Sequence, residues 1–243
     1  MCSHRYTDSV GKKKGCLRRI GCLAAVVLTL IACVAAWVFL TWPDVPALAT
    51  ENPETTAFIE TAKARGDGVE WNWVPYDRIS IEIKKAVVAA EDMSFFSHNG
   101  FDTHELKIAA RDAVQGKRVR GASTLTQQLA KNLWLSPSRS PLRKVREAIL
   151  TWQLERSLSK QRVLELYLNV AQFGTETYGV GAAASRYFGV PAGTLNADQA
   201  ARLAAGLPRP STWHPGVSSR GYSAAVSRIQ DRVSRCDWLD KLL

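Results

Sequence analysis

The feature that most constrains this chain is a run of 21 residues, Ile20 to Leu40, that contains no charged side chain. At about 1.5 Å per residue, a helix of this length spans roughly 31 Å, enough to cross the hydrocarbon core of a bilayer. Six basic residues and one acidic residue lie within residues 1–19, while Trp37 and Trp42 lie near the far end of the run. This asymmetry predicts one transmembrane helix with its N-terminus inside the cell and the remaining chain outside.

Two alternatives remain open for this segment. A cleavable signal peptide would end at Ala47-Leu48-Ala49, although the apolar run exceeds the usual length of about 7–15 residues. The residues before Cys33 also resemble a lipoprotein signal, but the chain stays apolar for two further turns. We favour an uncleaved anchor, which predicts a basic tail at 1–19, a transmembrane helix at 20–40, a stalk at 41–55 and one domain at 56–243.

The charge and cysteine content limit the chemistry of the outer part. The net charge is +10 at pH 7, and half of it lies in residues 1–19, so the remainder is moderately basic. Such a body suits an anionic surface or ligand, and nothing beyond this modest charge suggests nucleic-acid binding. Only Cys236 follows the predicted anchor, so the outer part has no partner for an internal disulfide and no zinc-type cluster.

After the stalk, apolar residues recur with the 3.6-residue period of an α-helix. Strand signals are sparse, so a single mainly α domain is predicted. Within the second expected helix, Leu106 and Ala109 are expected to face the core. The expected helices span residues 79–90, 103–114, 125–133, 142–158, 160–171, 180–187, 197–207 and 223–240.

A pair of acidic residues, Glu91 and Asp92, ends the first of these helices. The ordinary interpretation is a solvated helix end, although carboxylates there oppose the helix dipole. Phe95 and Phe96 follow, and an apolar wall would raise the pKa of a carboxylate and make it a usable base near neutral pH. His98 could titrate as well, but a lone histidine is more often structural.

The stretch at 120–135, RGASTLTQQLAKNLWL, is rich in uncharged hydrogen-bonding groups and continues into Lys131 and Asn132. A core would not tolerate these groups unpaired, and a plain surface helix would favour Glu and Lys. The segment therefore predicts a site for a polar ligand.

A second cluster, RSPLRKVREAILTWQLERS, carries several cations and Glu147. As a solvated i,i+4 pair, Arg143 and Glu147 would contribute only about 0.3–0.5 kcal/mol. Together with Lys131, however, Arg139 and Arg143 could line an anion site that stabilises the charge developing on a leaving group.

Read in order, these motifs resemble a family. EDMSFFSHNGFD is similar to the E-D-x-x-F-x-x-H-x-G signature of the peptidoglycan glycosyltransferases, found as monofunctional enzymes and in class A penicillin-binding proteins. RGASTLTQQLAKN resembles the second motif, with Ala122 in place of its second glycine. RKVRE, KQRVLELYLN and the region FGTETYGVG to LAAGLPRPSTWHPG resemble the other three, so five motifs follow one another over residues 79–216.

The resemblance implies a lysozyme-like helical fold with a small membrane-embedded portion, and lipid II as substrate. It implies that Glu91 deprotonates the acceptor 4-hydroxyl, which attacks the donor sugar with inversion and displaces undecaprenyl diphosphate. Lys131 and Arg139 fall at positions that bind the donor diphosphate. Glu147, the second catalytic residue implied, would organise basic residues or hold a divalent cation such as Mg or Mn. Further substrate-binding positions implied are Arg111, Ser123, Gln127, Gln128, Asn132, Arg143 and Lys144.

Three other functions stay open. A lytic enzyme of the same general fold would use a catalytic glutamate without needing Lys131 and Arg139. A bifunctional enzyme would add a transpeptidase, but Ser157-x-x-Lys160 stands without a K-T-G motif. A membrane-tethered scaffold would have no catalysis. For the transferase, we expect lipid II, the nascent glycan strand and membrane lipid as partners, cell-division or elongation proteins as further ones, and a cytoplasmic (inner) membrane location with the domain on the periplasmic face.

Overall fold

The computed structural model describes residues 40–116, 123–136 and 140–243, together with residues 22, 25–30, 32, 33, 36 and 38. The chain divides into two compact units, Met1–Asp44 and Val45–Leu243. In the first unit, the described residues up to Leu40 are helical and exposed. Within the described part of the chain, no helix is both long enough and apolar enough to span a membrane. Much of the predicted span at 20–40 lies outside that part, so the transmembrane helix stays a prediction.

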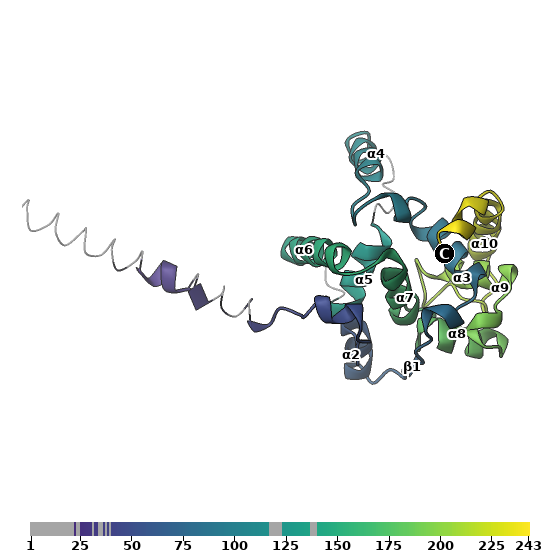
Figure 1. Ribbon diagram of the computed structural model, residues 1–243, viewed down its shortest axis with the longest axis horizontal. Coiled ribbons are helices and arrows are strands. Elements are labelled where there is room, and N and C mark those ends of the chain that lie inside the picture. The colour runs from purple at the N-terminus through teal and green to yellow at the C-terminus, as the bar shows by residue number, and fades with distance from the viewer. Residues whose placement is uncertain are drawn as a thin grey trace, which may run out of the picture. The chain divides into compact units, whose positions relative to one another are not determined.

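The second unit is mainly helical, as the apolar period predicted (Figure 1). Its α-helices are α2 (Ala57–Ala64), α3 (Ile81–Glu91), α4 (Thr103–Val114), α5 (Leu125–Trp134), α6 (Pro141–Ser157), α7 (Lys160–Val170), α8 (Gly179–Phe188), α9 (Ala197–Gly206) and α10 (Arg220–Val233). Short 3-10 helices are η1 (Pro46–Ala49), η2 (Tyr76–Arg78), η3 (Phe95–Ser97), η4 (Ala192–Thr194) and η5 (Asp237–Lys241). The strands β1 (Glu70–Trp71) and β2 (Thr177–Tyr178) pair in parallel, with Glu70 opposite Thr177.

Seven of the eight expected helices are confirmed to within two residues at either end. The expected helix at 223–240 is wrong at both ends. It begins at Arg220 because the Ser219 hydroxyl accepts the Tyr222 N–H at 3.2 Å, and it ends at Val233, before η5. Helix α2, eight residues long, was not among the expected helices, and it packs against α5.

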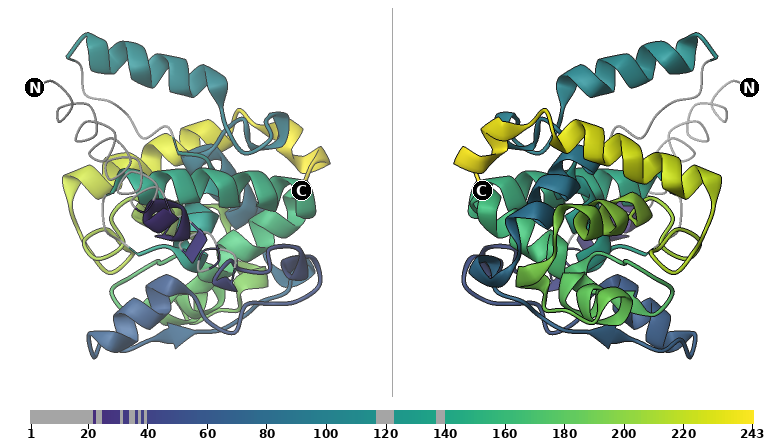
Figure 2. Two further views of the ribbon diagram at one scale, coloured as in Figure 1. Left: turned by 90° about the vertical axis from the view of Figure 1, so that its left-hand side faces the viewer. Right: turned by 90° about the vertical axis from the view of Figure 1, so that its right-hand side faces the viewer.

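Two groups of helices make up the packed body. In one, α5 packs against α2, α6 and α7; in the other, α3 packs against α9 and α10. Figure 2 shows α10 running along one side of this body. Fully buried leucines fill the first group: Leu125, Leu129, Leu150, Leu154 and Leu164.

Helix α4 projects from the packed body (Figures 1 and 2). Leu106, expected in the core, is 43% exposed, so that expectation was wrong. The apolar period of a helix shows that one face is apolar, but a neighbouring element must be present to cover that face. For Leu106 the described residues provide too little cover.

Helix α6 has apolar residues on its exposed side as well as on its buried side. Leu142, Val145, Ile149 and Trp152 lie at helical spacing, and all are exposed, from 44% at Ile149 to 82% at Leu142. We call these four residues the α6 apolar face. Exposed apolar runs of this kind are typical of surfaces that contact a protein partner or a membrane.

The stalk is held against the body through Arg162 of α7. Its Nε donates to the Leu48 carbonyl at 2.8 Å, and its Nη2 donates to the Glu51 carbonyl at 2.7 Å and to Asn52 Oδ1 at 2.8 Å. The planar guanidinium suits this arrangement because its donors point in fixed directions. One side chain thus fixes the path of the chain around η1.

Candidate active site

Glu91 is the last residue of α3. Its Oε2 accepts a hydrogen bond of 2.8 Å from Nε2 of Gln128 on α5, and the side chain is half-buried. The carbonyl groups at the end of α3 disfavour negative charge there. Glu91 therefore lies where the fold makes ionisation difficult but supplies one polar partner.

The surroundings of Glu91 act on its pKa in opposite directions. Burial is the largest cause and raises the pKa above its ordinary value, and the negative charge of Asp92 adds to this effect. The hydrogen bond from Gln128 and the positive charges of Lys131 and Arg232 lower the pKa. The net result is a raised pKa, which suits a carboxylate that takes up a proton near neutral pH.

The orientation of the Gln128 amide is set by Tyr167 of α7. The Tyr167 hydroxyl donates to Gln128 Oε1 at 3.0 Å, which leaves the amide nitrogen to face Glu91. Burial raises the pKa of Tyr167 well above its ordinary value, and the negative charges of Glu91 and Asp92 raise it further. Tyr167 therefore keeps its proton and remains a donor.

Asp92 and His98 connect the end of α3 to the start of α5. The buried Asp92 carboxylate accepts the Leu125 N–H at 2.9 Å and lies 2.9 Å from His98 Nε2. Nδ1 of His98 accepts the Gly100 N–H at 3.1 Å, so the ring proton is on Nε2 and is donated to Asp92. Both side chains are thus engaged in the fold, and the structural interpretation of His98 is confirmed.

Lys131 lies one turn beyond Gln128 on α5 and is half-buried. Burial lowers its pKa, and this is the largest cause. The negative charges of Glu147 and Glu91 raise the pKa, whereas the positive charge of Arg143 lowers it. The fold therefore places Lys131 within electrostatic reach of both acidic residues that the sequence singled out.

Glu147 of α6 is an ion-paired carboxylate. Its Oε2 pairs with Arg143 Nη1 at 2.8 Å and its Oε1 pairs with Lys144 Nζ. The Arg143–Glu147 pair was expected, but its interpretation as a solvated surface pair is wrong, because the Glu147 side chain is only 4% exposed. Once buried, such a pair depends on both partners far more than a surface pair does.

The surroundings of Glu147 show whether a divalent cation could bind to its carboxylate. Each carboxylate oxygen already faces a cationic side chain. Across the described ranges, no group of three or more His, Cys, Asp or Glu residues is arranged to hold a metal ion. The described surroundings of Glu147 do not fit a metal ion, and they favour the other implied role, which is to organise basic side chains.

The polar residues in and just before α5 have different structural roles. Gln127 is buried and forms a capping box, in which its Oε1 accepts the Thr124 N–H at 3.0 Å and its own N–H donates to Thr124 Oγ1 at 3.2 Å. The side chain of Gln127 thus serves the helix start. Ser123 is exposed beside Glu91, and Asn132 is buried beside Lys131.

Arg111, one of the predicted binding residues, is not joined to this cluster in the part of the chain that the structure describes. Arg111 lies exposed on α4, and in the described residues no hydrogen bond or ion pair links it to Glu91, Lys131 or Glu147. Arg139 lies outside the described residues. Their roles remain predictions from the resemblance.

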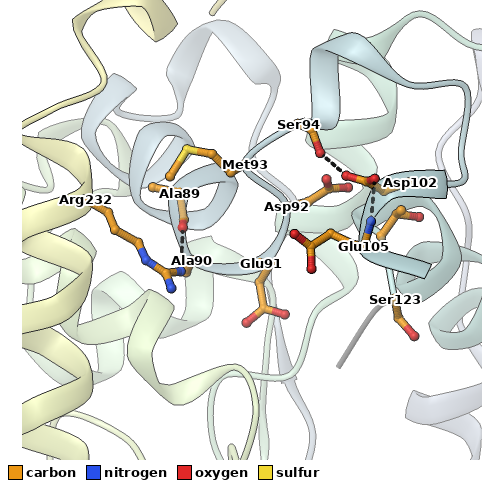
Figure 3. A pocket seen from close by; sticks show the side chains of 11 residues that line it. Ala89, Ala90, Glu91, Asp92, Met93, Ser94, Asp102, Glu105, Ser123 and Arg232 are labelled. Atoms are coloured by element: carbon orange, nitrogen blue, oxygen red, sulfur yellow. Dashed lines mark hydrogen bonds between the residues drawn. The ribbon is translucent and has the colours of Figure 1, made fainter. Parts of the chain in front are cut away.

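Two cavities lie along the hydrogen-bond chain from Tyr167 to Glu91. The first, the Glu91 cavity, has a volume of about 350 Å³ and is lined by Glu91, Asp92, Ser123 and Arg232 among others (Figure 3). The second, the Lys131 cavity, has a volume of about 440 Å³ and is lined by Gln128, Lys131, Asn132, Tyr167 and the loop at 207–212. Glu91 lines the first cavity, and its hydrogen-bond partner Gln128 lines the second.

Sequence reasoning missed Tyr167 and Arg232. Tyr167 lies within a recognised motif, but no local pattern shows that its hydroxyl reaches Gln128. Arg232 lies in the last turn of α10, in a region where no motif was found, and its Nη1 donates to the Ala89 carbonyl at 3.1 Å. Only the packing of α10 against α3 brings it to the site.

Comparison with known proteins agrees with these motifs. A family model described as Transglycosylase matches residues 58–235. A "Biosynthetic peptidoglycan transglycosylase" of Thiobacillus denitrificans is 45% identical over 220 residues, covering 86% of this chain and 91% of that protein. A protein of the same name from Bordetella avium is 40% identical over 240 residues, covering 94% and 99%. Because the family model and these relatives each cover most of the sequence, the chain belongs to the transglycosylase family.

Proposed function

We propose that this protein is a peptidoglycan glycosyltransferase that polymerises lipid II into glycan strands and has no transpeptidase activity. Membership of the transglycosylase family and relatives named as biosynthetic enzymes support this function. The observation that carries the mechanism is the setting of Glu91, a half-buried carboxylate with a raised pKa that lines one cavity while its partner Gln128 lines the other.

In the proposed reaction, Glu91 is the general base. It takes the proton from the 4-hydroxyl of the acceptor sugar as that oxygen bonds to C1 of the donor sugar, and the bond from C1 to the diphosphate breaks. A single displacement inverts the configuration at C1 and needs no covalent nucleophile. The raised pKa of Glu91 makes it a stronger proton acceptor than a solvated carboxylate, while Gln128 stabilises the ionised form that must be present first.

The leaving group is undecaprenyl diphosphate, and we assign its recognition to the Lys131 cavity. Positive charge held near the departing oxygen stabilises the charge that develops there. Glu147 holds Arg143 and Lys144 in place through its two carboxylate oxygens, and both cations lie within electrostatic reach of Lys131. Arg139 joins this group by the resemblance alone.

We further propose that the protein works at the outer face of the cytoplasmic membrane. The charge-free run at 20–40 would anchor it, and the domain at 56–243 would follow the stalk at 41–55. The α6 apolar face offers a second contact with lipid, and the Arg156 guanidinium lies 5.0 Å from the Trp152 ring centre. Aromatic and basic side chains together are typical of membrane–water interfaces.

The test is polymerisation of purified lipid II by the detergent-solubilised protein beside its Glu91→Gln variant. We expect glycan polymer from the wild type and none from the variant, with both proteins folded by circular dichroism. Abundant polymer from Glu91→Gln would refute the role of Glu91. Failure of both proteins, with cleavage of finished peptidoglycan by the wild type, would favour the lytic alternative.

A further inference from the structure

Arg232 approaches Glu91 from an element that carries none of the recognised motifs. Figure 3 shows its side chain reaching from α10 toward the end of α3, on the side of the Glu91 cavity opposite Ser123. Its Nη1 donates to the Ala89 carbonyl at 3.1 Å, two residues before Glu91. The carbonyl groups at a helix C-terminus attract cations, so this guanidinium has a fixed position at the point where the helix dipole disfavours a carboxylate.

We propose that Arg232 is a positioning residue for Glu91: α10 places a fixed positive charge at the cavity that Glu91 lines, and this charge favours the ionised form that the transfer requires. The inference rests on the proposed role of Glu91 as the general base. It adds to Lys131 a second cation that acts on Glu91, supplied by the C-terminal part of the chain rather than by the recognised motifs.

Charged and titratable groups act on Glu91 from several elements: Asp92 at the end of α3, Lys131 on α5, Tyr167 on α7 and Arg232 on α10. Two further carboxylates line the same cavity, Asp102 just before α4 and Glu105 within it, and neither supplies positive charge. Asp92 and Tyr167 supply no positive charge. Lys131 does, but it lies in the cavity assigned to the donor diphosphate, and a bound anion would compensate its charge. Arg232 lines the other cavity, so it can support the ionised carboxylate after the donor has bound.

The experiment compares the full-length wild type with Arg232→Gln, Arg232→Lys and a matched control, Arg220→Gln. Arg220 lies on the same helix at about 18 Å along its axis, so its substitution removes the same charge at a distance. One readout is kcat/KM for lipid II against pH, which reports groups of the free enzyme. The other is ¹³C NMR titration of the carboxyl groups without substrate, with the Glu91 signal assigned by its loss in Glu91→Gln.

We expect the Glu91 titration in Arg232→Gln to move to higher pH, and the acid limb of kcat/KM to move with it. On that limb the rate falls several-fold, whereas at alkaline pH it converges on the wild-type value. Arg232→Lys keeps the charge and should stay near wild type, and Arg220→Gln should not shift.

An unchanged Glu91 titration in Arg232→Gln overturns the proposal. So does a KM increase at every pH with that titration unchanged, because Arg232 would then be a substrate contact. Equal behaviour of Arg232→Lys and Arg232→Gln would also exclude an effect of charge. If the wild type fails to polymerise lipid II, the proposed function fails, but the substrate-free titration still decides the role of Arg232.

Discussion

At the scale of single residues, Glu91 and Glu147 are two helical carboxylates in different settings. Glu147 has a cationic side chain beside each oxygen, whereas Glu91 accepts a hydrogen bond from a neutral amide and has a raised pKa caused mainly by burial. A carboxylate engaged in two ion pairs is poorly placed to take a proton, while one facing a neutral donor is free to do so. This difference supports assigning the base to Glu91 and an organising role to Glu147.

Gln128 is expected to tune the base through its hydrogen bond. Replacing it by Leu removes the donor that favours the charged form of Glu91, so the pKa of Glu91 should rise and the acid limb of kcat/KM should move to higher pH. Below the midpoint we expect about a tenfold lower kcat/KM, because hydrogen bonds to charged groups contribute about 1.5–3 kcal/mol. Gln172→Leu is the matched control, since Gln172 lines the Lys131 cavity as Gln128 does but donates to the Gly174 carbonyl. Equal shifts for both variants would contradict this role.

Glu147 and Lys144 form one ion pair but differ in exposure, so their variants test how burial affects the contribution of each residue to stability. Glu147→Ala should lower the free energy of unfolding by about 3–5 kcal/mol, because it breaks an ion pair whose carboxylate is only 4% exposed and leaves Arg143, whose side chain is 19% exposed, without its partner. Lys144→Ala should cost less than about 1 kcal/mol, since the Lys144 side chain is 51% exposed. Urea unfolding of the two variants measures both values. Similar losses would show that the buried environment of Glu147 does not matter.

At the scale of elements, α6 has apolar residues on two opposite sides. Leu150 and Leu154 are fully buried against the body, while the α6 apolar face points away from it. A helix that is apolar on opposite sides needs a second apolar phase. Lipid satisfies this need if the protein works at a membrane surface.

Two tryptophans of similar exposure test that interpretation. Trp152 on α6 is 52% exposed and Trp238 on η5 is 42% exposed. Using the body of residues 45–243, we expect Trp152→Asn to weaken vesicle binding about tenfold, the result of losing about 1.4 kcal/mol of apolar burial. Trp238→Asn should leave binding unchanged. Vesicle flotation measures both, and equal losses would argue against lipid contact by α6.

At the scale of the whole molecule, the site draws on helices from across the chain. Glu91 comes from α3, Gln128 and Lys131 from α5, Tyr167 from α7 and Arg232 from α10. Each element carries its residue to the site through packing in one of the two helix groups. The packing of several helices therefore offsets the free-energy cost of partly removing the Glu91 carboxylate from water.

The free energy of global unfolding should show the cost of the ionised Glu91 carboxylate. Because burial raises the folded-state pKa of Glu91, the wild type loses stability as pH rises from the ordinary glutamate pKa to the raised value, by about 1.4 kcal/mol per unit of difference. Glu91→Gln does not titrate, so it should be more stable than the wild type at pH 8, with the advantage shrinking toward pH 4. Glu105→Gln, an exposed carboxylate of the same cavity, should show no such trend. Urea unfolding at both pH values checks this, and a constant difference would contradict it.

Several features of this protein followed from the sequence by itself. Helix positions were predictable because the 3.6-residue period and local capping residues such as Ser140 and Ser159 act within a few residues of the chain. The family followed from five motifs in order, since their residue types and spacings are local. The prediction that Glu91 and Lys131 are site residues followed from their places in those motifs.

The tertiary structure decided what depends on contacts between distant segments. It buried Glu147, left Leu106 exposed, and brought the Tyr167 hydroxyl to Gln128 and the Arg232 guanidinium to the end of α3. The physical reason is that burial and electrostatic environment depend on which elements pack together. A periodic pattern shows that a helix has an apolar face, but only packing determines what that face meets.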